Sequence, residues 1–168
     1  MNLTARPQSN GRKTFRRSHH TPLLKMPANV QSIKVAAYSA QAEDLKHIYM
    51  VGSLRRPVPH PFFRDERAEV ILCFYKKGDG GLFHWHPEVT EYEFVIEGRM
   101  GYHSVSDGRE HWFEAGDMIC IPAGICVRRL VPTRVRTLTV KVPSRDDKIH
   151  CRRCVRVCPC RVEKAEGA

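Results

Sequence analysis

The sequence predicts an all-β fold, an antiparallel sandwich or barrel, on two observations. Between residues 68 and 143, short runs of β-branched and aromatic residues recur at intervals of about ten residues, separated by Gly, Pro and Asp in turn positions. No helical pattern lies between these runs, which argues against a parallel α/β sheet. A length of 168 residues fits one hydrophobic core.

Eight strands are expected in this region. The expected strands are 70–76, 82–86, 92–96, 100–106, 110–114, 118–121, 127–131 and 134–142. The residues between them, at 78–81, 98, 106–108, 115–117 and 122–124, include Gly, Pro and Asp, which favour turns. Around residues 91–96 acidic and apolar side chains alternate, so Glu91 and Glu93 are expected to line the interior while Tyr92 and Phe94 form an apolar outer face.

We expect four segments along the chain: 1–25, 26–67, 68–143 and 144–168. Residues 1–25 carry six Lys and Arg and no acid, so they are a disordered basic tail or precede the true translation start at Met26. Residues 26–67 contain a strand at 33–39 and a helix at 43–51, where Leu45, Ile48 and Tyr49 have helical spacing. The barrel follows at 68–143, and 144–168 form a basic, cysteine-rich tail.

The formal net charge of +10 does not by itself predict nucleic-acid binding. Residues 26–168 carry 22 Lys and Arg against 18 Asp and Glu, so we expect no strongly basic face on the folded domain. No stretch reaches the roughly 18 consecutive apolar residues that a membrane span requires. We therefore expect a cytoplasmic protein with a small-molecule substrate and without a membrane or nucleic-acid partner, whose seven cysteines are reduced or bind metal.

Two histidines and a glutamate form the strongest functional motif. His84 and His86 lie two residues apart on an expected strand, so both side chains project from one face. Glu91 begins the next strand, which folds back beside them. Two imidazoles and a carboxylate suit one divalent ion, Fe(II), Mn(II), Zn(II), Ni(II) or Co(II), although such pairs also occur on strands as packed or surface residues. Glu93 shares the face of Glu91 and is the candidate catalytic acid or base.

The spacing of this motif resembles the first signature motif of the cupin superfamily. The matching residues are Gly78, His84, His86, Glu91 and Gly98, and the later series Gly116, Pro122 and Gly124 resembles the start of the second cupin motif. The resemblance covers about residues 70–142 and implies a double-stranded β-helix, a jelly-roll barrel with the site in its mouth. Together with the flanking segments, the expected fold is this barrel with a short N-terminal helical segment and flexible termini.

The resemblance also implies a function and one departure from the family pattern. The position of the usual fourth ligand, a histidine in the second motif, is Val127 here. His103 on the neighbouring expected strand is a candidate stand-in, and a packed or solvent-exposed histidine is the equal alternative. A site with two His and one Glu matches the ligand count of Fe(II) oxygenases, so a metal-dependent dioxygenase with Fe(II) is expected; isomerase or lyase chemistry is the other enzymatic option. The alternative is a non-catalytic or metal-free cupin that binds a small ligand such as a sugar derivative. Related barrels commonly form homodimers.

A cysteine cluster near the C-terminus is a candidate second metal site for zinc or iron. Its residues are Cys151, Cys154, Cys158 and Cys160, and nearby arginines favour their thiolate forms. A tail with free thiols is the alternative. A cupin barrel followed by such a tail is similar to bacterial 3-hydroxyanthranilate dioxygenase, whose tail binds a second iron, although the cysteine spacing differs. Cys73 and Cys120 lie on expected strands and are expected to be buried apolar residues.

Overall fold

The structure is a computed structural model that describes residues 23–24, 30–39 and 46–151. Its elements are β1 (Leu23–Leu24), α1 (Ala36–Ser39), β2 (His47–Val51), β3 (Phe62–Phe63), β4 (Glu69–Tyr75), β5 (Phe83–Trp85), β6 (Thr90–Glu97), β7 (Arg99–Ser104), β8 (Glu110–Glu114), β9 (Met118–Ile121), β10 (Val127–Leu130), β11 (Val135–Val142) and β12 (Ile149–Cys151). Among these residues, no helix is long and apolar enough to cross a membrane.

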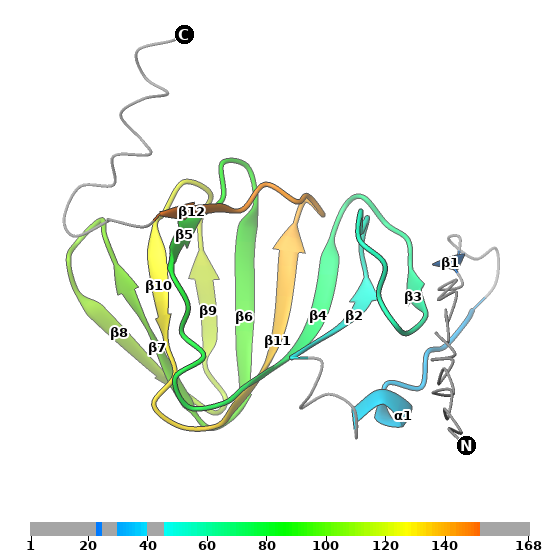
Figure 1. The fold of residues 1–168 in the computed structure, drawn as a ribbon, viewed down its shortest axis with the longest axis horizontal. Coiled ribbons are helices and arrows are strands. Elements are labelled where there is room, and N and C mark those ends of the chain that lie inside the picture. Colours follow the sequence, from blue (N-terminus) through cyan, green and yellow to red (C-terminus); the bar gives the residue numbers. More distant parts are fainter. Residues whose placement is uncertain (1–22, 25–29, 40–45, 152–168) are drawn as a thin grey trace, which may run out of the picture.

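The strands form two sheets that together make the barrel (Figure 1). The larger sheet has the order β1–β3–β2–β4–β11–β6–β9, and the smaller sheet has the order β12–β5–β10–β7–β8. All pairings are antiparallel except those of β3 with β1 and with β2. Strands β5 and β12 are far apart in the sequence but pair with each other at one edge of the smaller sheet.

The space between the sheets is filled by one apolar cluster to which both sheets contribute. Val95 and Val135 from the larger sheet and Met100 from the smaller one are fully buried in it. The strand period of two explains the pattern on β6, where Val95 points inward and its neighbour Ile96 is exposed. This shared core holds the two sheets together and leaves one end of the barrel for polar side chains.

A second apolar cluster covers the outer face of the larger sheet near its N-terminal strands. Ile48 of β2 and Leu72 and Phe74 of β4 are buried there, and Val35 and Tyr38, from the segment containing α1, pack against them. Figure 1 shows α1 beside this end of the sheet. Strand β2 therefore has apolar contacts on both of its faces, because Tyr49 points into the main core.

The double-stranded β-helix is confirmed, and all eight strands expected between 70 and 142 are present with ends shifted by at most two residues. Two expectations N-terminal to the barrel are wrong. Residues 36–39 form helix α1, where a strand at 33–39 was expected, and residues 47–51 form β2, where a helix at 43–51 was expected. Strand β12 was not expected at all. Of the flexible termini that the sequence suggested, residues 23–24 form β1 and residues 144–151 lead into β12, which pairs with β5; the other residues of the two tails lie outside the described residues.

Candidate metal centre

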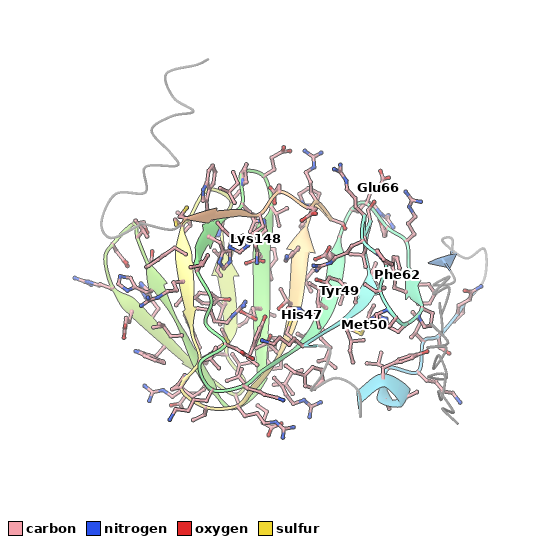
Figure 2. All side chains as sticks on the ribbon, in the orientation of Figure 1. His47, Tyr49, Met50, Phe62, Glu66 and Lys148 are labelled. Carbon is pink, nitrogen blue, oxygen red and sulfur yellow. The ribbon has the colours of Figure 1, made fainter. Side chains whose placement is uncertain are left out.

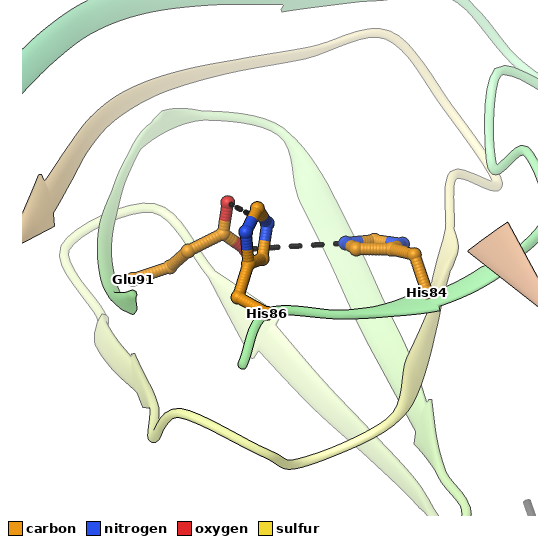
Figure 3. Close-up of side chains that lie close together, drawn as sticks. All are labelled: His84, His86 and Glu91. Carbon is orange, nitrogen blue, oxygen red and sulfur yellow. Dashed lines mark ion pairs between the residues drawn. The ribbon is translucent and has the colours of Figure 1, made fainter. Parts of the chain in front are cut away.

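Three buried side chains converge at one end of the barrel (Figure 3). His84 lies on β5, His86 directly follows β5, and Glu91 lies on β6. His86 Nε2 lies 3.4 Å from Glu91 Oε1, and His84 Nε2 lies 3.9 Å from Glu91 Oε2. One ligand atom from each residue falls within 4.8 Å of the others, and all three residues are buried. The structure thus brings together the His-His-Glu set that the sequence singled out, in an arrangement that could hold a metal ion.

Strand geometry places the two imidazoles on the same face. Trp85, between them, points the other way into a small apolar cluster with Cys126 and Cys151. After His86 the chain turns at Pro87 and returns as β6, which presents Glu91. The local hairpin therefore brings the three side chains to the same place.

The other nitrogen of each imidazole faces an acceptor. His86 Nδ1 lies 2.5 Å from Asp147 Oδ1, and His84 Nδ1 lies 3.4 Å from the carbonyl oxygen of Leu82. A carboxylate or carbonyl can only accept, so each ring can place a proton on Nδ1 and present a lone pair at Nε2 to a metal ion. Both Nε2 atoms are buried and have no hydrogen-bond partner among the described residues. Two free imidazole lone pairs beside a carboxylate fit a divalent transition metal.

The protonation states of His84 and Glu91 also favour metal binding. Burial lowers the pKa of His84, which favours the neutral imidazole that a metal needs. Burial alone would raise the pKa of Glu91, but the two imidazoles and the Lys141 ammonium outweigh it and hold that pKa well below its usual range. Glu91 is therefore a carboxylate, and its oxygen atoms are available as ligands.

Lys141 is a neighbour of Glu91 that the motif did not predict. The two residues are direct partners in the pairing of β11 with β6, and Lys141 Nζ lies 3.4 Å from Glu91 Oε1 and 3.5 Å from Glu69 Oε1. A signal was present in the sequence, because Thr137, Thr139 and Lys141 alternate along one strand and so share its inner face. The lysine balances the buried carboxylate in the protein itself.

The place of the usual fourth ligand is apolar. Val127 on β10 is the direct partner of His84, is buried and belongs to the main core. His103 does not replace it: its ring lies 5.5 Å from that of Phe83, which alternates with His84 and so faces away from the site. His103 is therefore not a stand-in ligand, and the alternative, a histidine packed away from the site, agrees with the structure. On the other side of His84, its direct partner is His150 of β12, with ring centroids 6.1 Å apart.

Glu93 lies deeper in the barrel than Glu91 and is 1% exposed. It accepts hydrogen bonds from Tyr102 Oη at 2.5 Å, Thr137 Oγ1 at 2.7 Å and Thr139 Oγ1 at 3.2 Å. Arg129 Nη2 lies 3.3 Å from its Oε1 and also donates to Tyr102 Oη at 2.6 Å. Every acceptor direction of Glu93 thus points to a neighbour within the protein.

A cavity of about 590 Å³ adjoins the His-His-Glu set, which forms part of its wall. Glu93 does not line it, but Arg129, which Glu93 holds, does. His47 and Tyr49 of β2 and Lys148 of the segment before β12 line the cavity from parts of the chain far apart in sequence (Figure 2). The segment 145–150, which the sequence assigned to the C-terminal tail and not to the barrel site, contributes Arg145, Asp146, Lys148 and His150.

Of the four C-terminal cysteines, only Cys151 lies within the described residues; Cys154, Cys158 and Cys160 lie outside them. Cys151 is buried on β12, and its Sγ lies 4.0 Å from that of Cys126. Cys73 is buried as expected, whereas Cys120 is exposed on the outer face of β9. The second metal site stays a prediction.

Several known proteins are similar to part of this chain. No curated protein sequence matches the chain significantly. Among solved structures, a protein with a double-stranded β-helix domain from Klebsiella pneumoniae is similar with 20% identity over 51% of this chain and 71% of its own, at a TM-score of 0.47. The nucleoside dehydratase Pac13 is similar with 18% identity over 51% and 69%, at 0.45; Pac13 from Streptomyces has also been solved with uridine.

A third similar structure is a cupin-superfamily sugar phosphate isomerase from Silicibacter pomeroyi, with 27% identity over 45% of this chain and 50% of its own, at a TM-score of 0.41. At the level of sequence, residues 71–133 match the family profile described as the cupin domain. This segment runs from β4 through β10 and contains the whole His-His-Glu set. The barrel of this chain is a cupin domain.

Proposed function

We propose that the protein is a metal-dependent enzyme that acts on a small organic molecule at one divalent ion held by His84, His86 and Glu91. The observation that carries the proposal is the pair of buried Nε2 atoms without hydrogen-bond partners, beside a buried carboxylate. A buried polar atom without a partner costs about 1–3 kcal/mol. A cation between the three side chains would remove that cost for both imidazoles.

The cavity supports a substrate of small-molecule size. Its volume of about 590 Å³ lies within the range of roughly 300–1,000 Å³ that is typical of small-molecule sites. Its wall contains the proposed ligands, so a bound molecule would lie next to the ion. A bound divalent ion would supply Lewis acidity and, if it is Fe(II), oxygen chemistry. The residues of the chain hold and orient the reactants around it.

Dioxygenase chemistry with Fe(II) is the finer form of the proposal, and its support is the ligand count. Two histidines and one carboxylate, with Val127 at the fourth position, leave coordination sites open as in the facial arrangement of Fe(II) oxygenases. Mn, Ni, Co and Zn fit the same ligands, and isomerase or lyase chemistry is the other enzymatic option. Glu93 acts in this proposal as a positioning residue, because it does not line the cavity itself and contacts it through Arg129 and Thr139, which do.

The test is the metal content of protein isolated without added metal, measured by mass spectrometry. We expect close to one ion per chain, and loss of that ion in His84→Ala and in His86→Ala. His103→Ala is the matched control, because His103 lies on the outer face of the same sheet. Retention of the ion in both site variants would overturn the assignment. Iron in protein isolated without oxygen would support oxygenase chemistry, and zinc in its place would count against it.

A metal-free cupin that binds a small ligand, such as a sugar derivative, is the second candidate. The observation that favours it is Lys141, which already balances the charge of Glu91. Such a protein would show no bound ion at any stage of purification, and adding Zn(II), Mn(II) or Fe(II) would leave its melting temperature unchanged. A rise in melting temperature that the His84→Ala substitution abolishes would eliminate this candidate.

A further inference from the structure

The cavity beside the His-His-Glu set is strongly cationic. Its wall carries seven Lys and Arg side chains against four Asp and Glu side chains. The cationic residues are Lys46, Arg55, Arg56, Arg129, Lys141, Arg145 and Lys148, and the acidic ones are Glu69, Asp79, Glu91 and Asp146. Because a bound divalent ion would add two further positive charges against the single charge of Glu91, the excess would grow when the metal is present.

Several of these cations are already paired. Lys46 Nζ lies 2.9 Å from Asp79, Lys141 contacts Glu69 and Glu91, and Arg145 contacts Glu88. Lys148 differs from them. It has no carboxylate within ion-pair distance and no hydrogen-bond partner among the described residues, although it is half-buried in the cavity wall.

The surroundings of Lys148 destabilise its charged ammonium form. Burial is the largest influence and lowers its pKa to about 8; Glu91 opposes the shift, and the nearby cations Lys141 and Arg129 add to it. A half-buried ammonium group with cations as neighbours would be stabilised by any anion that enters the cavity.

Arg129 supplies a rigid second donor. Its guanidinium is held by Glu93 and Tyr102 and lies over the Tyr75 ring, 4.3 Å from the ring centroid. Within the part of the chain that the structure describes, its Nε has no hydrogen-bond partner. A guanidinium fixed in this way at a cavity wall is suited to bind a carboxylate or phosphate group. Arg55 and Arg56 are exposed lining residues for which the described segments provide no carboxylate partner, and they attract anions from solution.

We propose that the ligand of this cavity is a small organic anion whose carboxylate or phosphate group binds Lys148 and Arg129. This inference depends on the proposed function in one respect: the proposed function places a metal ion next to the bound anion. Binding of the anion by Lys148 and Arg129 does not require the metal. Lys148 adjoins Asp147, whose carboxylate lies against His86. The segment before β12 therefore carries, at adjacent positions, the proposed anion-binding Lys148 and the Asp147 carboxylate that holds His86.

The test measures binding to metal-free protein, so that it does not depend on the metal. Inorganic phosphate and succinate are the probes, succinamide is the uncharged analogue of succinate, and chloride at equal ionic strength controls for screening. We expect phosphate or succinate to raise the melting temperature and to bind measurably by calorimetry, with succinamide and chloride ineffective. The tighter of the two anions identifies the group that the site prefers.

Variants of Lys148 give the decisive comparison. Lys148→Gln should weaken anion binding about tenfold, a loss of 1.4 kcal/mol, and Lys148→Arg should retain most of it. Lys77→Gln removes the same charge from an exposed position outside the cavity and should bind as wild type does. Equal affinity for succinate and succinamide, or unchanged affinity in Lys148→Gln, would overturn the inference. If the protein binds the anions but never takes up metal, the inference of an anionic ligand is supported and the proposed metal-dependent function is contradicted.

Discussion

His86 donates a hydrogen bond from Nδ1 to Asp147 Oδ1, at 2.5 Å, across 61 positions of the sequence. The second oxygen of the same carboxylate accepts from the backbone amides of Glu88 at 2.8 Å and Val89 at 3.2 Å. Burial would raise the pKa of Asp147, but these donors outweigh it and lower that pKa. One carboxylate therefore fixes both the imidazole ring and the turn that leads to Glu91.

Asp147→Ala should weaken metal binding without removing a ligand. Carboxylates that hold a ligating imidazole typically contribute 10–100-fold to metal affinity. We expect a loss of that order for Zn(II), measured by competition with a chromophoric chelator at fixed pH. Glu88→Gln is the control, because its side chain is exposed and pairs with Arg145 rather than with a ligand. Equal affinity in wild type and Asp147→Ala would show that His86 needs no support.

Val127→His should restore a fourth ligand. Val127 and His84 are direct partners on adjacent strands, so their side chains share a face. An imidazole at this position should raise the affinity for Zn(II) at least about tenfold, or 1.4 kcal/mol. The metal-free variant should lose about 1–3 kcal/mol of unfolding free energy, because a larger side chain enters the core. Val127→Leu separates the two effects, since it enlarges the residue without adding a ligand; equal metal affinity in Val127→His and Val127→Leu would contradict the prediction.

The barrel strands could be predicted because each follows the period of two and ends at a turn residue. On β6, for example, buried Glu91, Glu93 and Val95 alternate with Tyr92 and Ile96. Strand β2 could not be predicted in the same way. Ile48 packs under the segment that contains α1 and Tyr49 packs in the main core, so adjacent residues are both apolar and the pattern matches a helix.

The proposed ligands were equally accessible to sequence analysis, because they lie within eight residues of one another along a hairpin. Their surroundings were not. Asp147 and Lys148 reach the site from the segment before β12, and no local pattern relates that segment to His86. For Glu93, the period of two correctly predicted a position inside the barrel. Only the structure shows that its carboxylate is bound by Tyr102, Thr137 and Arg129.

Glu93→Gln should destabilise the fold strongly. The substitution removes the negative charge that faces buried Arg129, and breaking a buried ion pair in this way costs about 3–5 kcal/mol. We expect a loss near the lower end of that range in urea unfolding, because the amide keeps some hydrogen bonds. Glu97→Gln is the matched control on the same strand: its exposed carboxylate lies 3.5 Å from Arg136, and its loss should cost less than about 1 kcal/mol. Comparable losses in the two variants would contradict the buried network.

The same pair of variants tests the role of Glu93 at the metal. As a positioning residue acting through Arg129, Glu93 should influence anion binding and leave the metal content at one ion per chain. Glu93→Gln should therefore weaken succinate binding to metal-free protein at temperatures where the variant is folded. Normal succinate affinity together with lost metal would place Glu93 beside the ion, as an acid or base, and would contradict a positioning role.

His47 should make the fold less stable in mild acid. Burial, followed by the charges of Arg129, Lys148, Lys141 and Arg56, lowers its pKa from 6.5 to about 4, and the rings of Tyr49 and Tyr75 pack beside it. Between these values the unfolded chain binds a proton that the folded chain does not, so unfolding free energy falls as pH decreases from 6.5 towards 4. Above pH 6.5 the residue adds no slope.

Urea unfolding of metal-free protein at several pH values measures this effect. His47→Gln cannot take up the proton, so its unfolding free energy should fall less than that of wild type between pH 6.5 and 4, even if the variant is less stable at every pH. An NMR titration of the His47 ring in the folded protein gives the direct check, with a midpoint expected near 4. A midpoint near 6.5 would mean that the ring is hydrated and distant from the cavity cations, and the two slopes would then be the same.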